Sequence, residues 1–183
     1  MSENIDFRVD YNKFKVMDEF NTDELKYPLI LSIPHCGTVF PEEFLRAVRH
    51  DVMTLRKNED ILVYDLLEPA IRDGGIAAIK LNVSRSFIDV NRAKVELDPN
   101  MFFDYPREDI GLNQQRSRYG LGIIHKVTAD SRPIYAGRIS YKEAEERIKN
   151  VYDVYHGRLK ELIARTIDKF GFCLVFGDRK DLA

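Results

Sequence analysis

Residues 29–41, LILSIPHCGTVFP, constrain the fold more than any other part of the chain. The segment begins with a nearly continuous apolar run, residues 29–33, which is typical of a strand buried on both faces of a sheet. Pro34 ends the run, a turn of small residues follows, and Pro41 with the glutamates after it is typical of a helix start. The pattern predicts that the imidazole of His35 lies at the carboxyl end of a buried strand, where open α/β sheets bind their ligands.

The spacing of apolar residues in the segments that follow predicts an α/β fold. Helices are expected from Pro41 to about His50 and over residues 60–72. A strand over residues 76–83 then completes a strand–helix–strand unit, and its crossover should be right-handed.

The last third of the chain predicts a long helix and another strand. Ser140 and Glu143 resemble a capping box, and the apolar period after them predicts a helix to about Lys169. Gly171 ends it, and residues 172–176 are expected to form a further buried strand.

The length of the chain suits a single domain. At 183 residues it can bury a substantial core, so residues 1–183 are expected to form one domain. Residues 1–28 are polar with scattered aromatics, which predicts an arm lying over the core. Residues 93–122 lack a clear period, and an irregular stretch of this kind is more often a functional lid than a plain connector.

Charge and cysteine content exclude several classes of protein. A formal net charge of -2 without a long basic run gives no support for binding nucleic acid, although local arginines could bind a small acidic molecule. Cys36 and Cys173 do not make a disulfide framework in a chain of this length. Because no apolar run has the length of a signal-peptide core or a membrane span, we expect a cytoplasmic protein without a membrane partner.

His35 is the first candidate site residue. A single histidine beside a buried strand is often structural, but Gly37 next to it would let a ligand approach closely. A neutral imidazole in this position could bind Zn²⁺.

Asn58, Glu59 and Asp60 place polar side chains at the start of the next expected helix, which the crossover should bring back to the same edge of the sheet. Two interpretations fit. In the simpler one, Asn58 or Asp60 caps the helix. In the other, a carboxylate of this segment binds a ligand.

The densest polar cluster is residues 82–92, where two arginines, an aspartate and two asparagines are interleaved with apolar residues. Burying such groups without partners is costly, so a structural ion pair between Asp89 and an arginine is one interpretation. In the other, Arg85 or Arg92 binds a substrate carboxylate through the paired hydrogen bonds for which a guanidinium is suited.

The remaining histidines differ in their settings. His156 shares a helix face with Tyr152, and it is either a structural histidine bonded to a neighbour or part of the site. His50 and His125 have no such setting, and surface or structural roles are expected for both.

Taken together, these segments resemble the N-formylglutamate amidohydrolase family, also called N-formylglutamate deformylases. The matching pieces follow in order from about Tyr27 to Phe176: SIPHCGTVFP, NED, SRSFIDVNR, RPIYAGR, VYDVYHGRL and KFGFCLVF. IPHxG and IDxNR are specific in combination, whereas either alone would be weak.

The resemblance implies a zinc-dependent hydrolase with a three-layer, phosphorylase/hydrolase-like α/β fold around a mixed central sheet, akin to zinc carboxypeptidases. Members release formate and glutamate from an N-formyl amide in one route of histidine degradation. His35 and Asp60 would be metal ligands, with Glu59 as the alternative to Asp60. The residues implied to face the substrate or to brace the site are Arg85, Asp89, Asn91, Arg92 and His156.

The resemblance breaks off after Phe176. Family members have an Asp-x-His-Ser motif there, whose histidine is the third zinc ligand, whereas this chain has Asp178-Arg179-Lys180 and ends soon afterwards. A C-terminally truncated fold is therefore expected. Its exposed edge at residues 172–176 would favour a homodimer.

Two hypotheses follow from this departure. The first is an active amidohydrolase that takes its third ligand from Asp178, His156 or another chain. The second is an inactive member that acts as a binding protein or is the remnant of an interrupted gene.

Overall fold

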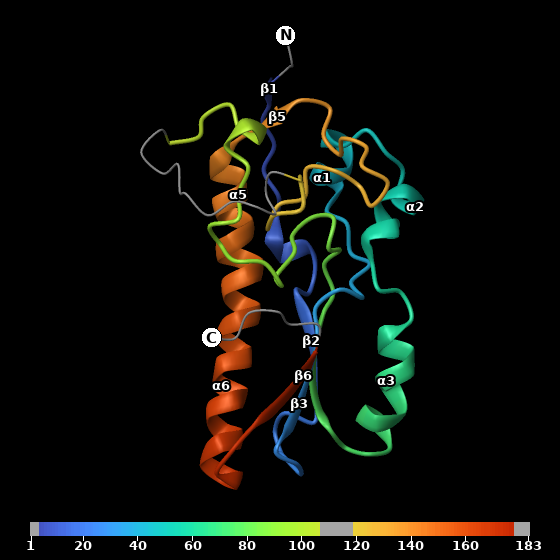
Figure 1. The fold of residues 1–183 in the computed structure, drawn as a ribbon, viewed down its shortest axis with the longest axis vertical. Coiled ribbons are helices and arrows are strands. Elements are labelled where there is room, and N and C mark those ends of the chain that lie inside the picture. The colour runs from blue at the N-terminus through green and yellow to red at the C-terminus, as the bar shows by residue number, and fades with distance from the viewer. Residues whose placement is uncertain (1–3, 107–118, 178–183) are drawn as a thin grey trace.

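The computed structural model describes residues 4–106 and 119–177. At its centre is a four-stranded sheet with the strand order β2-β4-β3-β6. The strands are β2 (Met17–Phe20), β3 (Leu29–Ile33), β4 (Ala77–Leu81) and β6 (Leu174–Gly177). β3 is parallel to β4 and β6, and β2 is antiparallel to β4, so the sheet is mixed, as predicted. β1 (Asn4–Ile5) and β5 (Arg138–Ile139) form a separate parallel pair, which lies away from this sheet at the top of Figure 1.

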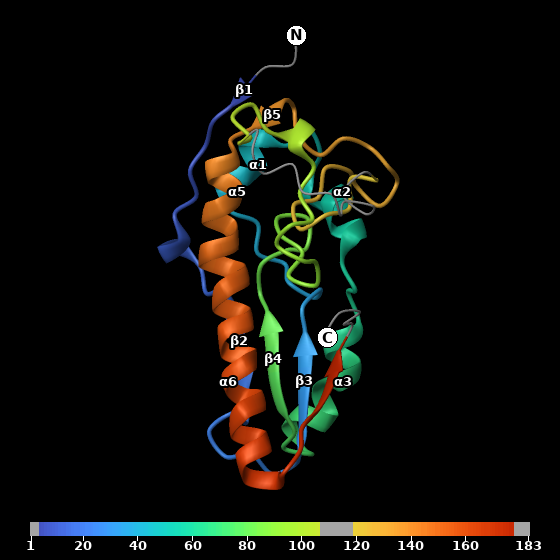
Figure 2. The same ribbon diagram turned by 60° about the vertical axis from the view of Figure 1, so that its left-hand side comes forward.

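Helices lie on both sides of the sheet, with α6 and α3 flanking the strands in Figure 2. The helices are α1 (Glu42–Ala47), α2 (Val52–Leu55), α3 (Val63–Arg72), α5 (Tyr141–Arg147) and α6 (Asp153–Phe170). A π-helical stretch (Ile148–Tyr152) joins α5 to α6. Short 3₁₀ turns occur at Tyr11–Lys13, Arg56–Asn58 and Pro99–Met101. No helix of the described ranges is long and apolar enough to cross a membrane.

The side chains of β3 explain why the sheet is covered on both faces. Ile30 packs into the same cluster as Leu159 of α6, whereas Leu31 and Ile33 pack with Ile71 of α3. Successive side chains of a strand point to opposite faces. An apolar run without alternation therefore needs a helix on each side, which is what the crossovers supply.

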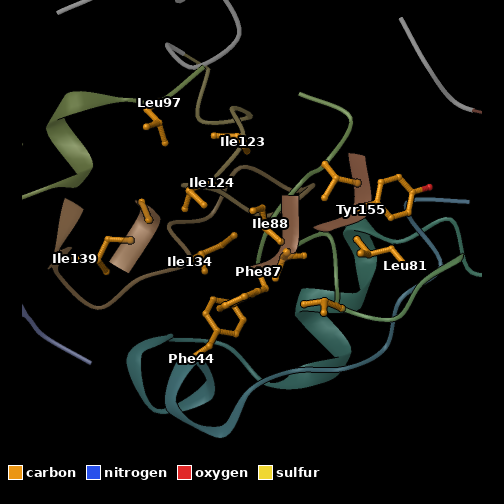
Figure 3. Close-up of a cluster of buried hydrophobic side chains, with 14 of the residues drawn as sticks. Phe44, Leu81, Phe87, Ile88, Leu97, Ile123, Ile124, Ile134, Ile139 and Tyr155 are labelled. Carbon is orange, nitrogen blue, oxygen red and sulfur yellow. The ribbon is translucent and has the colours of Figure 1, made fainter. Parts of the chain in front are cut away.

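A further part of the core lies beyond the carboxyl ends of the strands and is built largely by irregular segments (Figure 3). Phe44 of α1 packs edge-on against Phe87, with their ring centroids 5.3 Å apart. Phe87 and Ile88 are fully buried, and Asp89, which follows them, is buried as well. Because its apolar neighbours are buried, the carboxylate of Asp89 lies in the interior as well.

Most predicted elements are present, with shifted ends. The strand over residues 29–33 is confirmed as β3, and the strand expected over residues 76–83 is the shorter β4. The helix expected over residues 60–72 begins at Val63, because the preceding residues form a turn that faces the sheet edge. Residues 17–20 of the expected arm form β2. The expected lid, residues 93–122, falls partly outside the described residues.

The capping box at Ser140 is wrong. Ser140 precedes α5, but its hydroxyl donates to Asp104 Oδ2 at 2.8 Å. Asp104 Oδ1 accepts the backbone N–H of Tyr141 at 2.6 Å. A carboxylate distant in the sequence therefore caps this helix.

The expectation of a buried final strand is also wrong. β6 pairs with β3 on one side only in the described residues, and Leu174 and Phe176 are 59% and 62% exposed. Burial of an edge strand depends on what packs beside it, which an apolar run alone does not encode.

Candidate functional site

The carboxyl ends of β3 and β6 flank the place where a ligand is expected. From β3 the chain crosses through α3 to β4 on one side, whereas β6 lies on the other side of β3. Such a reversal of strand order opens a crevice at the carboxyl ends of the strands. A pocket of about 350 Å³ lies there, lined by residues 32–36, Asp60, Val63, Leu67, Phe176 and Gly177.

His35 forms the buried wall of this pocket, with 1% of its surface exposed. Its Nδ1 lies 3.1 Å from Asp60 Oδ2, and its Nε2 lies 3.0 Å from Asp89 Oδ1. A neutral imidazole has one N–H to donate, whereas both carboxylates are acceptors. With Nε2–H donated to the buried Asp89, the lone pair of Nδ1 faces Asp60. A shared proton or a metal cation between Nδ1 and Oδ2 would stabilise this arrangement.

Backbone contacts hold Asp60 against His35. The N–H of Asp60 donates to His35 O at 3.1 Å, and the Cys36 thiol donates to Asp60 O at 3.1 Å. Burial raises the pKa of the Cys36 thiol, which keeps it protonated as a donor. Helix α3 begins after Leu62 without a side-chain capping bond, so the capping interpretation of Asp60 is wrong.

Glu59, the alternative ligand, is bound elsewhere. Its carboxylate accepts hydrogen bonds from Arg56 Nε at 2.9 Å and Ser84 Oγ at 3.1 Å. Burial raises the pKa of Glu59, and its side chain does not line the pocket. Asp60 is therefore the carboxylate of this segment that faces His35.

The carboxylate of Asp89 is fully buried and is surrounded by several hydrogen-bond donors. Arg85 Nε donates to Oδ2 at 2.9 Å, and Arg92 Nε lies 3.5 Å from the same oxygen. The backbone N–H of Asn91 donates to Oδ1 at 2.9 Å. The ion pair expected between Asp89 and an arginine is confirmed. Neither arginine lines the pocket, so their contact with a substrate stays a prediction.

His125 also contacts Asp89, and the sequence did not reveal this contact. His125 is buried, its Nε2 lies 3.3 Å from Asp89 Oδ2, and its Nδ1 lies 3.4 Å from Asn58 Nδ2. Because Asp89 accepts and the Asn58 amide donates, the neutral tautomer with a proton on Nε2 satisfies both contacts. Burial alone would raise the pKa of Asp89, but the hydrogen bonds from His125 and His35 hold it well below its usual range.

The other histidines lie outside the pocket. His156 Nε2 donates to Val90 O at 2.8 Å, and its ring centroid is 4.1 Å from that of Tyr152. This is the structural setting that was one of its two interpretations. His50 is half-buried, and its Nε2 lies 3.0 Å from Pro133 O, which fits the structural role among its two expected roles.

The donor set for a metal is incomplete in the described part of the chain. Residues 4–106 and 119–177 contain no group of three or more His, Cys, Asp or Glu side chains arranged to hold a metal ion. His35 and Asp60 supply two donors. Of the third ligands considered from the sequence, Asp178 lies outside the described residues, and His156 is bonded to Val90 O and does not line the pocket.

Gly37 is expected to be indispensable for the geometry around His35. A Cβ at this position would overlap with the backbone carbonyl of Val83, because the two segments are joined by hydrogen bonds of Val39 to Asn82 and Ser84. Gly37→Ala is therefore expected to lower the free energy of unfolding by about 1–3 kcal/mol, measured by urea denaturation.

Gly157→Ala is the matched control for that prediction. Gly157 lies in α6 with open space around its Cα, so alanine there is expected to stabilise the protein by up to about 1 kcal/mol. Equal effects of the two substitutions would contradict the close approach at Gly37.

His125 is expected to make the protein acid-sensitive. Burial lowers the pKa of His125 in the folded state, Asp89 opposes this, and Arg85 and Arg92 add to it. The unfolded state therefore binds the proton more readily, and stability is lost as the pH falls through the unfolded value of about 6.5. The slope of the unfolding free energy between about pH 7 and 5 should flatten in His125→Gln. An unchanged slope would show that His125 does not contribute.

The family model of N-formylglutamate amidohydrolase matches residues 27–177. Among solved structures, an N-formylglutamate amidohydrolase from Ralstonia eutropha JMP134 is similar with a TM-score of 0.78 and 26% identity over 88% of this chain and 56% of that one. A gene product from Agrobacterium tumefaciens has a TM-score of 0.58 and 16% identity over 92% of this chain and 57% of the other, which supports the fold alone. The chain thus spans a little over half the length of these two proteins. None of the curated proteins matches it.

Proposed function

The chain belongs to the N-formylglutamate amidohydrolase family, and on this basis we propose that it is a zinc-dependent amidohydrolase. Its substrate would be a small acidic N-formyl or N-acyl amino acid, with formate and glutamate as the products from N-formylglutamate. The fold would be the three-layer, phosphorylase/hydrolase-like type akin to zinc carboxypeptidases. Helices on both faces of a mixed sheet support that assignment.

The observation that carries the proposal is the pair of His35 Nδ1 and Asp60 Oδ2, 3.1 Å apart at the pocket. Imidazole nitrogen and carboxylate oxygen are ordinary zinc ligands, and a catalytic zinc usually has three protein ligands and an open position. The third ligand would be one of the candidates that the sequence offers, namely Asp178, His156 or a residue of another chain. A bound zinc ion would act as a Lewis acid on the formyl carbonyl and would lower the pKa of a water to roughly 7.

The residues around the pair have separate tasks in this proposal. Asp89 holds the proton of His35 on Nε2, which keeps the Nδ1 lone pair directed at Asp60. Ile33, Leu67 and Phe176 give the pocket an apolar wall that limits the access of water.

Arg85 and Arg92 are the proposed partners of the substrate carboxylates. Both contact Asp89 through Nε, and the terminal nitrogens of a guanidinium are well suited to a carboxylate. Asn91 and His156 would complete this side of the site, since Asn91 is fixed to Asp89 and His156 to the neighbouring carbonyl of the same segment.

Formate release from N-formyl-L-glutamate tests the proposed activity. The zinc-loaded protein is expected to release formate, and His35→Ala is expected to fall to the uncatalysed rate because a ligand is lost. His50→Ala, which removes a half-buried histidine outside the pocket, should keep the wild-type rate. Zinc-loaded protein that binds the substrate without releasing formate would contradict the enzyme and favour a binding protein.

A further inference from the structure

Buried hydrogen bonds connect the two proposed ligands by a second route. His35 Nε2 contacts Asp89 Oδ1 at 3.0 Å, and Asp89 Oδ2 lies 3.3 Å from His125 Nε2. His125 Nδ1 in turn lies 3.4 Å from Asn58 Nδ2. Asn58 precedes Asp60 by two residues, and Asp60 faces His35 Nδ1. The contacts therefore close into a loop, and none of its three connecting residues lines the pocket.

Burial makes this loop rigid. Asp89, His125 and Asn58 are 0%, 2% and 8% exposed. The Asn58 amide is anchored a second time, because Nδ2 donates to Ser86 Oγ at 3.0 Å and that hydroxyl donates to Leu55 O at 2.7 Å. Rotation of any one side chain would leave a buried donor or acceptor of another without its partner, which is costly.

His125 links the two halves of the loop because it contacts both. With its proton on Nε2, His125 donates to Asp89 and accepts from Asn58. The ring therefore bridges the carboxylate that contacts His35 and the segment that carries Asp60. Removal of the ring would release both contacts together.

We propose that His125 and Asn58 are positioning residues, which fix His35 Nδ1 relative to the Asp60 carboxylate and thereby set the affinity of the site for zinc. This inference rests on the proposed zinc site. Groups that orient metal ligands from behind typically change metal affinity by about 10–100-fold when they are lost.

The dissociation constant for zinc, measured by competition with a chromogenic chelator, tests the proposal. His125→Leu fills a similar space without polar atoms and is expected to weaken zinc binding by about 10–100-fold. His125→Gln keeps a donor and an acceptor and should restore most of the affinity, which a merely space-filling role would not require. His50→Leu, the matched control for loss of a histidine, should bind zinc as the wild type does.

Asn58→Ala tests the other end of the loop and carries the experiment if His125→Leu does not fold, as judged by its melting curve. It is expected to weaken zinc binding in the same direction. Folded His125→Leu or Asn58→Ala protein with the wild-type zinc affinity would overturn the positioning role and leave the proposed function intact. A wild-type protein that binds no zinc would instead overturn the proposed function itself.

Discussion

Replacement of Asp89 by asparagine is expected to lower the free energy of unfolding by about 3–5 kcal/mol. The carboxylate is fully buried and neutralises Arg85 and Arg92, whose side chains are themselves only 18% and 13% exposed. Asparagine has the same shape but no charge, and its NH₂ group would face N–H donors. Two guanidinium groups would then be left in a poorly solvated place without their anion.

Urea denaturation at pH 7 measures this loss. Asp168→Asn is the matched control, because Asp168 lies on the exposed face of α6 and should leave the unfolding midpoint unchanged. A loss below about 1 kcal/mol for Asp89→Asn would place the ion pair among ordinary surface pairs and would contradict its role as the centre of the site.

The second large effect is expected at the buried pair of Glu143 and Arg147 in α5. Arg147 Nε donates to Glu143 Oε1 at 2.8 Å, and Nη1 donates to Phe87 O and Tyr135 Oη, both at 2.8 Å. The guanidinium also lies 4.1 Å from the centroid of the Phe87 ring. Burial raises the pKa of Glu143, and Arg147 opposes this shift.

Removing one partner of this pair should cost far more than removing both. Glu143→Leu leaves a buried cation and is expected to lose about 3–5 kcal/mol, and Arg147→Met should lose a similar amount. The double variant is expected to recover most of this loss, since well-packed apolar residues often replace a buried ion pair at little cost. A thermodynamic cycle from urea denaturation gives the coupling energy. Additive losses would show that the two charges do not act as a pair.

The parts of the site that could be predicted from the sequence are those that follow from local patterns. Residues 29–33 form a strand because an apolar run between turn signals favours a buried strand. The end of this strand predicted the position of His35 at the edge of the sheet. The crossover brought Asp60 back to the same edge. The polar cluster required a buried partner for its charges, and the ion pairs of Asp89 with Arg85 and Arg92 supply it.

The rest depends on contacts between distant segments. His125 contacts Asp89 and Asn58, which are 36 and 67 residues away in the sequence. No spacing in the sequence predicts contacts between residues so far apart. The cap of α5 comes from Asp104 for the same reason, although Ser140 looked like a local cap. A local pattern cannot show that a carboxylate brought in by the tertiary fold will bind both the Ser140 hydroxyl and the Tyr141 N–H.

The zinc content of the purified protein tests the central claim most directly. After incubation with zinc and removal of the excess, metal analysis is expected to find about one zinc per chain in the wild type and none in His35→Ala. Asp60→Asn should lose most of the metal, whereas Glu59→Gln, whose carboxylate is bound by Arg56 and Ser84, should keep it. A wild-type protein without zinc, or His35→Ala protein that retains the full amount, would contradict the account.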